Sequence, residues 1–341
     1  MSAATLSGDS ESSYAAKLAV GIPQLLPKHP RVVSILPVSA PGGHHPNIKR
    51  VILSTGGSVI AKRHLFAPVT AGHPYHLLSV EKAASDLLVR NGCPVPSVLG
   101  VIEKLGVVIL EDVGKGTLDD FVQSRPPLER ANLAAAAVDA FVHIQETLIR
   151  QNQLKEEVFA PGCDEDSIRS SFLGLEAAFD ADSLRSLIAR REKIDTVLGH
   201  IHRVVLNLAD RPMVLGPTDY NARNIVVAKS GDPIYLEWSK LGYDWPERRV
   251  VQYLTSLGAG TRGAQPRTLI DPWIATRYAA AASWSDPEAA AFSLDGHHLI
   301  FHLLLALRWA AQGAFPRGIR AALSTPLSRS PVTIGLRRLF S

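Results

Sequence analysis

The sequence changes its hydrophobic pattern near residues 113–118. Upstream of that point it has short apolar runs separated by turns, which is typical of strands. Downstream it has long segments with apolar side chains at helical spacing. We therefore expect a β-rich N-terminal lobe followed by a helical C-terminal lobe, after a polar, disordered tail. The expected boundaries are 1–12 for the tail, 13–113 for the N-lobe and 114–341 for the C-lobe.

Individual elements follow from the same patterns. A turn at Gly56-Gly57 separates two apolar runs and predicts a hairpin. Strands are expected at 31–40, 48–54, 58–66, 107–113, 224–228 and 233–238. Helices are expected at 76–92, 131–152 and 183–208, and the rest of the chain is expected to be helical down to residue 312.

The composition of the 341 residues is that of a globular protein. Hydrophobic residues make up 46% and charged residues 20%, which excludes a wholly disordered chain. Cys93 and Cys163 are too few for a disulfide framework or a four-thiolate zinc site. The N-terminus lacks the pattern of a secretory signal, and the most apolar window, Leu299–Ala311, is shorter than a membrane span requires. We expect a cytoplasmic protein without a membrane partner.

Positive charge accumulates toward the C-terminus. From Thr261 onward nine arginines and no lysines stand against four acidic residues, so this segment has a net charge of +5. Such a segment can bind nucleic acid, a membrane or a phosphorylated small molecule, or can simply be solvated. No basic motif interleaved with aromatic residues accompanies it, so nucleic acid is not the expected partner.

Two charged residues in the N-lobe are candidates for a functional pair. Lys62 follows the core-like residues Val59 and Ile60 in an expected strand, where its ammonium either reaches solvent or meets an anion. Glu81 lies in the next helix and either pairs with Lys62 or is solvated. Neither residue decides the question alone.

The segment GPTDYNARNIVV (216–227) is the most informative stretch of the chain. Asp219 and Asn224 lie five residues apart on a loop that leads into a strand, so both can face one site. A carboxylate can accept a hydroxyl proton there, and an amide oxygen can bind a divalent metal. Glu237 follows thirteen residues after Asn224, and the short hairpin between them returns the chain to the same place. A polar turn that caps a strand is the alternative interpretation.

The order of these motifs resembles the aminoglycoside phosphotransferase and choline kinase-like family, which shares the protein-kinase fold. The motifs are VIAK (59–62), VEKAASDLLVRNGCPVP (80–96), VVILEDVGKGTL (107–118), PTDYNARN (217–224) and YLEW (235–238). The match covers roughly residues 40 to 255, and the motifs are specific as a set although each is weak singly. The resemblance implies a two-lobed, protein-kinase-like α+β fold with a nucleotide between the lobes.

The resemblance also implies a role for each matching residue. Asp219 would be the catalytic base, and Asn224 and Glu237 would hold Mg²⁺, with Mn²⁺ as a possible substitute. ATP would be bound by the Lys62 side chain, which Glu81 fixes, by the backbone of Glu111 and Val113, and by the segment from the Gly42-Gly43 turn up to Asn47. The reaction would be ATP- and Mg-dependent phosphoryl transfer to a hydroxyl of a small molecule.

The sequence departs from the family pattern at two positions. Pro217 replaces a histidine two residues before the base, and Glu237 replaces an aspartate. The longer glutamate leaves two functions open: a small-molecule kinase, or a catalytically weak nucleotide-binding regulator. The acceptor could be a sugar, a sugar phosphate or an aminoglycoside-like molecule, and the arginine-rich C-terminal segment favours a neutral or anionic acceptor over a polycation.

Three histidines form a separate candidate. His298 and His302 are an i,i+4 pair, next to His297, and such a pair can bind zinc on a helix face. No glutamate completes an HExxH motif, so packing within the helical lobe is the alternative.

Overall fold

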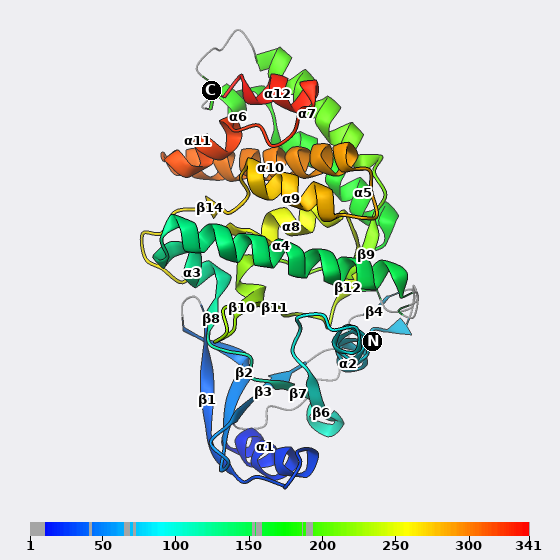
Figure 1. Cartoon of the computed structure of the whole chain (residues 1–341), viewed down its shortest axis with the longest axis vertical. Coiled ribbons are helices and arrows are strands. Elements are labelled where there is room, and N and C mark those ends of the chain that lie inside the picture. The colour runs from blue at the N-terminus through cyan, green and yellow to red at the C-terminus, as the bar shows by residue number, and fades with distance from the viewer. Residues whose placement is uncertain are drawn as a thin grey trace, which may run out of the picture.

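The computed structural model describes residues 11–40, 43–64, 69–70, 73–151, 154, 159–185, 187–188 and 194–340. These residues form two lobes, one built on a β-sheet and a larger one built mainly of helices (Figure 1). The predicted two-lobed α+β fold, with a β-rich N-lobe and a helical C-lobe, is therefore confirmed.

The N-lobe is built on a five-stranded antiparallel sheet with the strand order β1-β2-β3-β7-β6. Its elements are α1 (Glu11–Leu25), β1 (Val32–Ala40), β2 (Gly43–Leu53), β3 (Ser58–Arg63), β4 (Val69–Thr70), β5 (His73–Pro74), α2 (Leu77–Arg90), β6 (Val98–Ile102) and β7 (Val107–Glu111). Figure 1 shows α1 at the outer end of the sheet and α2 next to the C-lobe. The hairpin expected around Gly56-Gly57 is the β2–β3 hairpin.

The helix α1 is absent from the sequence prediction. It begins at Glu11, so the tail expected at 1–12 is wrong for residues 11 and 12, and residues 1–10 lie outside the described residues. Tyr14, Leu18 and Ile22 recur every four positions and are buried against the sheet. This single apolar stripe forms a helix because the sheet offers a face on which to bury it.

The apolar stripe predicted for α2 is confirmed. Its buried residues include Leu77, Val80, Ala84, Leu87 and Leu88. They belong to the same hydrophobic cluster as the central helix of the C-lobe, not to the cluster under the sheet. The two lobes therefore share a continuous apolar core at α2, which fixes this helix and its polar residues relative to the C-lobe.

The C-lobe begins directly after the sheet. Its elements are β8 (Gly116–Thr117), α3 (Leu118–Ser124), α4 (Pro127–Arg150), α5 (Glu165–Leu173), α6 (Ala181–Arg185), α7 (Ile194–Ala209), β9 (Val214–Pro217), β10 (Ile225–Val227), β11 (Pro233–Tyr235), β12 (Leu241–Asp244), α8 (Pro246–Tyr253), β13 (Thr255–Ser256), β14 (Arg267–Thr268), α9 (Pro272–Ala281), α10 (Pro287–Ala310), α11 (Arg317–Ser324) and α12 (Pro331–Arg337). The strands β10 and β11 form the hairpin expected between Asn224 and Glu237.

The C-lobe differs from the prediction in several places. The short strands β13 and β14 pair with each other in a segment that was expected to be helical. The helix expected at 183–208 corresponds to the short α6 and to α7, with residues 186 and 189–193 outside the description. The strands β9 and β12 pair with each other although neither was expected, because four-residue strands give little periodicity. The helices α11 and α12 extend the helical part beyond residue 312, and each begins next to a proline, Pro316 or Pro331.

The helix α10 is long and apolar enough to cross a membrane by length and composition alone. Its 24 residues start upstream of the window considered in the sequence, so the expectation based on that shorter window does not hold. However, 72% of its apolar window is buried inside the protein, as in the core helix of a helical lobe.

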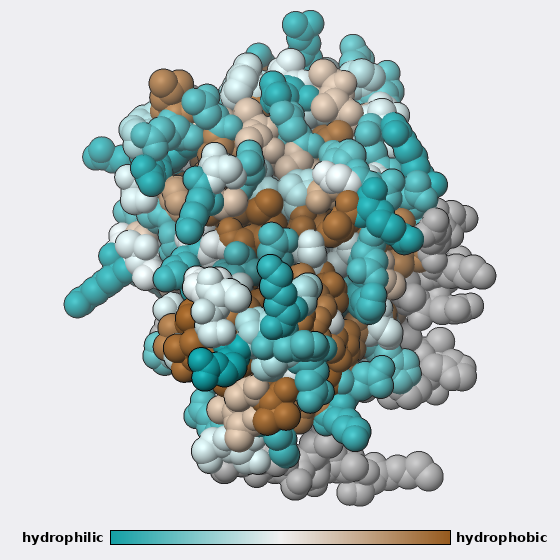
Figure 2. Space-filling view, turned by 60° about the horizontal axis from the view of Figure 1, so that its bottom comes forward, coloured by the Kyte–Doolittle hydropathy of each residue, from teal (hydrophilic) through white to brown (hydrophobic). Residues whose placement is uncertain are grey.

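Figure 2 turns the N-lobe end of the molecule toward the reader and shows apolar side chains among polar ones on that face. Exposed apolar residues of α1 and β1 include Val20, at 66% exposure, and Val33, at 65%. Single exposed side chains of this kind are normal on a soluble surface and define no site by themselves.

The three histidines of α10 are buried within the helical lobe. His297 packs against the rings of Phe172 and Trp245, with centroids 5.4 Å away in both cases. His298 and His302 lie with ring centroids 4.1 Å apart, and His302 Nδ1 is 2.7 Å from the carbonyl oxygen of His298. No group of three or more metal-binding side chains occurs among the described residues, so packing explains these histidines.

We expect acid to destabilise the protein through these histidines. Burial lowers the pKa of all three, and that of His302 to about 4. An unfolded histidine titrates near 6.5, so below about pH 6.5 the unfolded chain binds protons that the folded chain does not. The free energy of unfolding should therefore fall as the pH drops from about 6.5 to 4, by up to about 1.4 kcal/mol per pH unit for each histidine.

Urea unfolding at several pH values checks this expectation. His302→Gln should flatten the slope between pH 6.5 and 4, whereas His76→Gln, which changes an exposed histidine, should leave it unchanged. An unchanged slope in the His302→Gln variant would contradict it.

Candidate active site

A chain of charged groups joins the two lobes at Lys62. The Nζ atom of Lys62 on β3 donates to Glu81 Oε1 of α2 at 2.8 Å and to Glu237 Oε2 at 2.9 Å. Lys62 is 8% exposed and Glu81 only 1%. The structure therefore brings together three of the residues that the sequence analysis selected, and it resolves the open question of Lys62 and Glu81 in favour of a buried pair.

The environment keeps Lys62 and Glu81 charged. Burial lowers the pKa of Lys62, but the carboxylates of Glu237 and Glu81 outweigh it, so the net shift is upward. Burial raises the pKa of Glu81, but Lys62 and His64 outweigh it and leave the pKa lowered. His64 lies with Nε2 2.7 Å from Glu81 Oε2, so both carboxylate oxygens of Glu81 accept a hydrogen bond.

Glu237 has an unusual backbone conformation. Its φ angle is +67°, in the left-handed region that non-glycine residues rarely adopt, at a cost of roughly 1–3 kcal/mol. The residue follows β11 and precedes the buried Trp238, whose indole Nε1 donates to the Tyr235 carbonyl at 2.9 Å. Strain of this kind persists only where surrounding contacts fix the chain, and here it directs the Glu237 side chain to Lys62.

Asp219 and Asn224 lie on one loop between β9 and β10. The Nδ2 atom of Asn224 donates to the backbone oxygen of Asp219 at 2.7 Å, and Asn221 Nδ2 donates to the Asp219 carboxylate at 3.0 Å. The Asn224 amide nitrogen is thus committed to the loop, which leaves its side-chain oxygen for a metal. The Leu236 N–H donates to the Asn224 carbonyl at 2.8 Å. Asn224 therefore lies opposite Leu236 in the hairpin, and Glu237 is the next residue along the chain.

Arg249 of α8 holds the backbone next to the Asp219 loop in place. This fully buried guanidinium donates to the carbonyls of Pro217, Val214 and Gly242 at 2.8–3.1 Å. At Gly216 an added Cβ would lie 2.7 Å from the Arg249 guanidinium, so this position accepts only glycine without a shift. Neither residue was selected from the sequence, because the contacts of Arg249 with Val214, Gly216 and Pro217 join positions more than thirty residues apart.

Two tyrosines, Tyr220 and Tyr253, also belong to the surroundings of the Asp219 loop. The Tyr220 hydroxyl donates to Asp244 of β12, which holds the residue next to Asp219 in place. The pKa of the buried Tyr253 is raised, chiefly by burial and further by the negative charges of Asp219 and Glu237. Both carboxylates therefore lie close enough to affect one phenol, which supports a single site.

The predicted adenine-binding segment lies at the end of β7. The N–H of Glu111 already donates to the Ser97 carbonyl at 2.9 Å, so of its two backbone groups only the carbonyl oxygen could serve a ligand. Val113 lies beyond the last strand pair, and its backbone N–H and C=O make no hydrogen bond within the described part of the chain. An acceptor at Glu111 and a donor at Val113 suit the edge of a purine.

Gly43 and Asn47 both lie in β2. Gly43 has a φ angle of +151° and opens the strand, whereas Asn47 precedes Ile48, which pairs with Lys62 on β3. Residues 41 and 42 lie outside the described residues, so the turn that was expected to cover the phosphates is only partly described.

Asp112 holds the segment after β7 in place, and it was not selected from the sequence. Asp112 accepts from Arg50 Nε at 2.6 Å, from Arg50 Nη2 at 3.0 Å and from Ser58 Oγ at 2.5 Å. Arg50 Nη2 also donates to the Gly114 carbonyl at 2.7 Å. The pKa of Asp112 is lowered, because these donors outweigh the effect of its burial. The acidic pair Glu111-Asp112 was the available signal, but only the Glu111 backbone was assigned a role.

Two protein oxygens and the phosphates of a nucleotide are a usual ligand set for Mg²⁺. The Asn224 amide oxygen and the Glu237 carboxylate lie at adjacent hairpin positions and would supply oxygen ligands, so their chemistry fits such an ion. Glu237 Oε2 is already in contact with Lys62, which leaves Oε1 as the oxygen for the metal.

Comparisons with known proteins find similarity only to solved structures, at the level of overall fold. No family model and no curated protein matches it. Choline kinase LicA from Streptococcus pneumoniae is 14% identical over 91% of this chain and 94% of that chain, with a TM-score of 0.46. A choline/ethanolamine kinase family protein from Mesorhizobium loti is 14% identical over 96% and 98%, with a TM-score of 0.48.

A third match is the AMP-bound complex of spectinomycin phosphotransferase, 14% identical over 96% of this chain and 98% of that chain, with a TM-score of 0.44. Choline kinases and aminoglycoside phosphotransferases are the same groups that the sequence motifs resemble. Because identities are low and these TM-scores lie below 0.5, the function of this chain has to be derived from its own site.

We expect the Arg50–Asp112 pair to contribute measurably to stability. Asp112→Ala would leave the Arg50 guanidinium, whose side chain is 13% exposed, without its carboxylate. Breaking a buried pair costs about 3–5 kcal/mol, and partial exposure should reduce this to roughly 2–3 kcal/mol. A double-mutant cycle with Asp112→Ala, Arg50→Ala and the double variant, measured by urea unfolding, gives the coupling energy.

The exposed i,i+4 pair Lys82–Asp86 on α2 is the matched control. Its coupling energy should be below about 0.5 kcal/mol. If the two cycles gave equal coupling energies, the stabilising role of Asp112 would be contradicted.

Proposed function

We propose that this chain transfers the γ-phosphoryl group of Mg·ATP to a hydroxyl of a small molecule. The observation that supports this most directly is the buried Lys62 ammonium, held between Glu81 and Glu237. The Asp219 loop joins the same site through the hydrogen bond between Asn224 and Leu236. A fixed cation, a carboxylate on a loop and two oxygen ligands are the parts that phosphoryl transfer requires.

The nucleotide would lie between the lobes. The Glu111 carbonyl and the Val113 N–H would pair with the base, and Lys62 would contact the phosphates. Gly43 and Asn47 on β2 would lie over the phosphates, since β2 pairs with β3 beside Lys62. Solved structures of similar overall fold include complexes named for AMP and ADP, in keeping with this arrangement.

Asp219 would act on the acceptor. Its carboxylate would take the hydroxyl proton while the hydroxyl oxygen attacks the γ-phosphorus, and the bond from that phosphorus to the bridging oxygen would break to release ADP. Asn221 would hold the carboxylate through its 3.0 Å hydrogen bond during this step. Magnesium would neutralise phosphate charge and align the β- and γ-phosphates.

We propose a neutral or anionic acceptor. Arg223, exposed on the loop before Asn224, adds positive charge on the Asp219 side of the site. A polycation would be repelled by this charge.

The arginine-rich segment from Thr261 onward contributes less to the preference for a neutral or anionic acceptor than its net charge of +5 suggests. Arg277 pairs with Asp139, and the buried Arg337 pairs with Asp295. Figure 1 shows α11 and α12 at the end of the C-lobe farthest from the N-lobe. The acceptor preference therefore depends on Arg223.

One observation favours a second function, a catalytically weak nucleotide-binding regulator. Glu237 replaces an aspartate of the family pattern, and its Oε2 is in contact with Lys62. A carboxylate held in this way is less available to a metal that demands a regular octahedron.

The first test is Asp219→Asn. The amide retains an oxygen that can accept from Asn221, so folding should be preserved, but it cannot take a proton. Turnover should fall by about 100-fold or more, whereas nucleotide affinity should stay nearly unchanged. ATP consumption with a panel of sugars, sugar phosphates, choline, ethanolamine and aminoglycosides gives turnover, and calorimetric titration with ATP gives affinity.

Either of two outcomes would remove Asp219 from this role. One is wild-type turnover in the Asp219→Asn variant. The other is an equal loss of turnover and ATP affinity, which would indicate that the residue binds the nucleotide. No ATP consumption by the unaltered protein with any acceptor, with ATP still bound, would favour the regulator.

The second test varies the metal ion and the side chain at position 237. Mn²⁺ accepts imperfect oxygen sites more readily than Mg²⁺, so we expect activity with Mn²⁺ to equal or exceed that with Mg²⁺. Glu237→Asp should keep or raise activity, since aspartate also tolerates a left-handed backbone, and Glu237→Ala should abolish metal-dependent turnover. Metal titrations of ATP consumption in the three proteins measure these effects.

Metal-dependent turnover that persists in Glu237→Ala would mean that Glu237 binds no metal and only positions Lys62. Nucleotide binding without metal-dependent turnover in all three proteins would favour the regulator instead.

A further inference from the structure

A surface cavity of about 420 Å³ lies within the C-lobe. It is enclosed by the end of α3, the first turns of α4, the strand β14 with the residues that follow it, α10 and α11. None of the residues assigned to the candidate active site lines it. Its volume falls in the range of small-molecule binding sites, roughly 300–1,000 Å³.

The floor of this cavity is apolar and buried. Val122 of α3 is 1% exposed and Ile270 is 4% exposed, and Ala322 and Leu327 are buried as well. The residues at the mouth are half-buried or exposed, among them Ala321 on α11. The cavity therefore offers an apolar pocket that opens to solvent.

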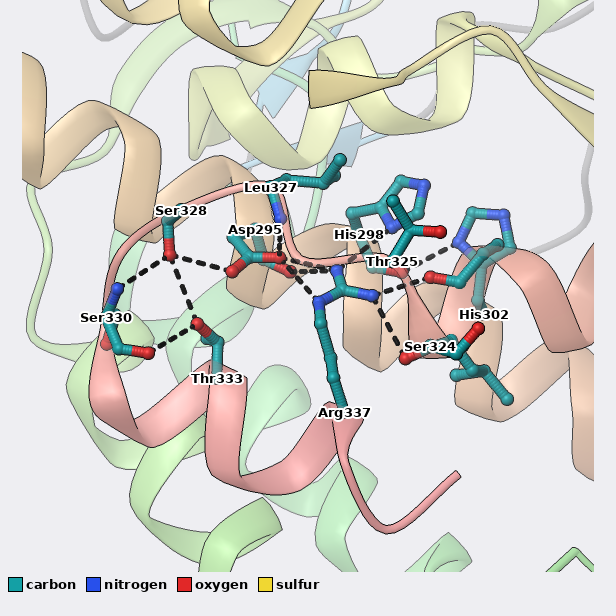
Figure 3. Close-up of polar contacts among 12 residues, drawn as sticks. Asp295, His298, His302, Ser324, Thr325, Leu327, Ser328, Ser330, Thr333 and Arg337 are labelled. Carbon is teal, nitrogen blue, oxygen red and sulfur yellow. Dashed lines mark hydrogen bonds and ion pairs between the residues drawn. The ribbon is translucent and has the colours of Figure 1, made fainter. Parts of the chain in front are cut away.

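A buried histidine forms the polar part of the floor. His298 Nδ1 lies 3.3 Å from Arg337 Nη2, and an arginine can only donate, so Nδ1 accepts. Figure 3 shows Arg337 reaching from α12 to Asp295 and His298 on α10. Burial lowers the pKa of His298, so the ring is neutral and has its single proton on Nε2.

The position of the His298 proton on Nε2 determines the direction of the hydrogen bond with Thr268. His298 Nε2 donates to Thr268 Oγ1 at 3.2 Å, and the Ile270 N–H donates to the same oxygen at 3.1 Å. Both lone pairs of the hydroxyl are used, so its own proton must be donated elsewhere. No acceptor for that proton occurs among the described residues, and Thr268 lines the cavity. The cavity therefore contains an unused donor.

Two arginines add positive charge to the mouth. Arg130 on α4 and Arg267 on β14 line the cavity, and neither has an acidic partner within the described part of the chain. Among the described residues, the Arg130 guanidinium contacts the Val122 carbonyl, at 3.5 Å from Nη1. The one acidic residue of the lining, Asp271, caps α9 by accepting from the Ile274 N–H at 2.8 Å. The charged residues of the lining sum to a net positive charge.

We propose that this cavity binds a small organic oxyanion, a carboxylate or phosphate monoester attached to an apolar group. The guanidinium groups of Arg130 and Arg267 and the Thr268 hydroxyl would donate to the oxyanion. The apolar group would lie on Val122, Ile270 and the neighbouring floor. Such a ligand satisfies the free donors and fills the apolar pocket at the same time, which neither a cation nor a purely polar molecule does.

Calorimetric titration of the full-length protein with phenyl phosphate tests the proposal. We expect a Kd on the order of 1 mM or tighter. Benzoate should displace phenyl phosphate, and benzyl alcohol, which has the same ring without a charge, should bind at least about tenfold more weakly. The Arg130→Gln/Arg267→Gln double variant and the cavity-filling Ala321→Trp variant should each weaken phenyl phosphate binding at least about tenfold.

The control variant is Arg317→Gln/Arg329→Gln, which removes the same charge from exposed arginines outside the cavity and should leave binding unchanged. No binding of phenyl phosphate, or equal binding by the Arg130→Gln/Arg267→Gln and unaltered proteins, would overturn the proposal. Equal binding of benzyl alcohol would overturn the oxyanion assignment. The measurement uses neither ATP nor an acceptor, so its result is independent of the proposed phosphotransferase activity.

Discussion

The buried ammonium of Lys62 is the interaction on which the arrangement of the two lobes depends. An unpaired ammonium at this depth would lose its charge, so the fold has to supply carboxylates from nearby. One comes from α2, through Glu81, and the other follows the β10–β11 hairpin of the C-lobe, through Glu237. The sheet, α2 and the C-lobe hairpin therefore meet at one atom. The apolar face of α2 reinforces this meeting point, because it packs into the C-lobe core.

The C-lobe also buries two charged side chains, Arg249 and Arg337, and supplies hydrogen-bond acceptors for both. Arg249 satisfies its guanidinium mainly with backbone carbonyls around the Asp219 loop, whereas Arg337 combines Asp295 with the carbonyls of Ala322 and Leu323. A guanidinium has five donors in a fixed plane, so it can hold several chain segments at once. Arg249 thereby holds the paired strands β9 and β12 next to the loop of the candidate base. Arg337 of α12 holds the last turn of α11 and Asp295 of α10 together.

The sequence predicted those parts of the fold and site that have short-range signals. The strand with Lys62, the helix with Glu81 and the hairpin between Asn224 and Glu237 all follow from periodicity and turn residues. The Arg50–Asp112 pair and the Arg249 contacts could not be predicted, because each joins residues that are distant in sequence and carry no periodic pattern. The helix α1 was missed for a related reason: its stripe of Tyr14, Leu18 and Ile22 is short, and the sheet face that it covers is formed by later residues.

The replacement of aspartate by glutamate at position 237 has a geometric consequence. The longer side chain reaches Lys62 at 2.9 Å from a left-handed backbone, so one carboxylate oxygen replaces part of the water that would otherwise solvate the ammonium. A phosphate that approaches Lys62 has to compete with this oxygen or displace it. Displacement frees both oxygens of Glu237 at the moment when a nucleotide-bound cation needs ligands, whereas retention leaves only Oε1. The proposed kinase and the alternative regulator would thus differ in one event, the release of Glu237 from Lys62 on nucleotide binding.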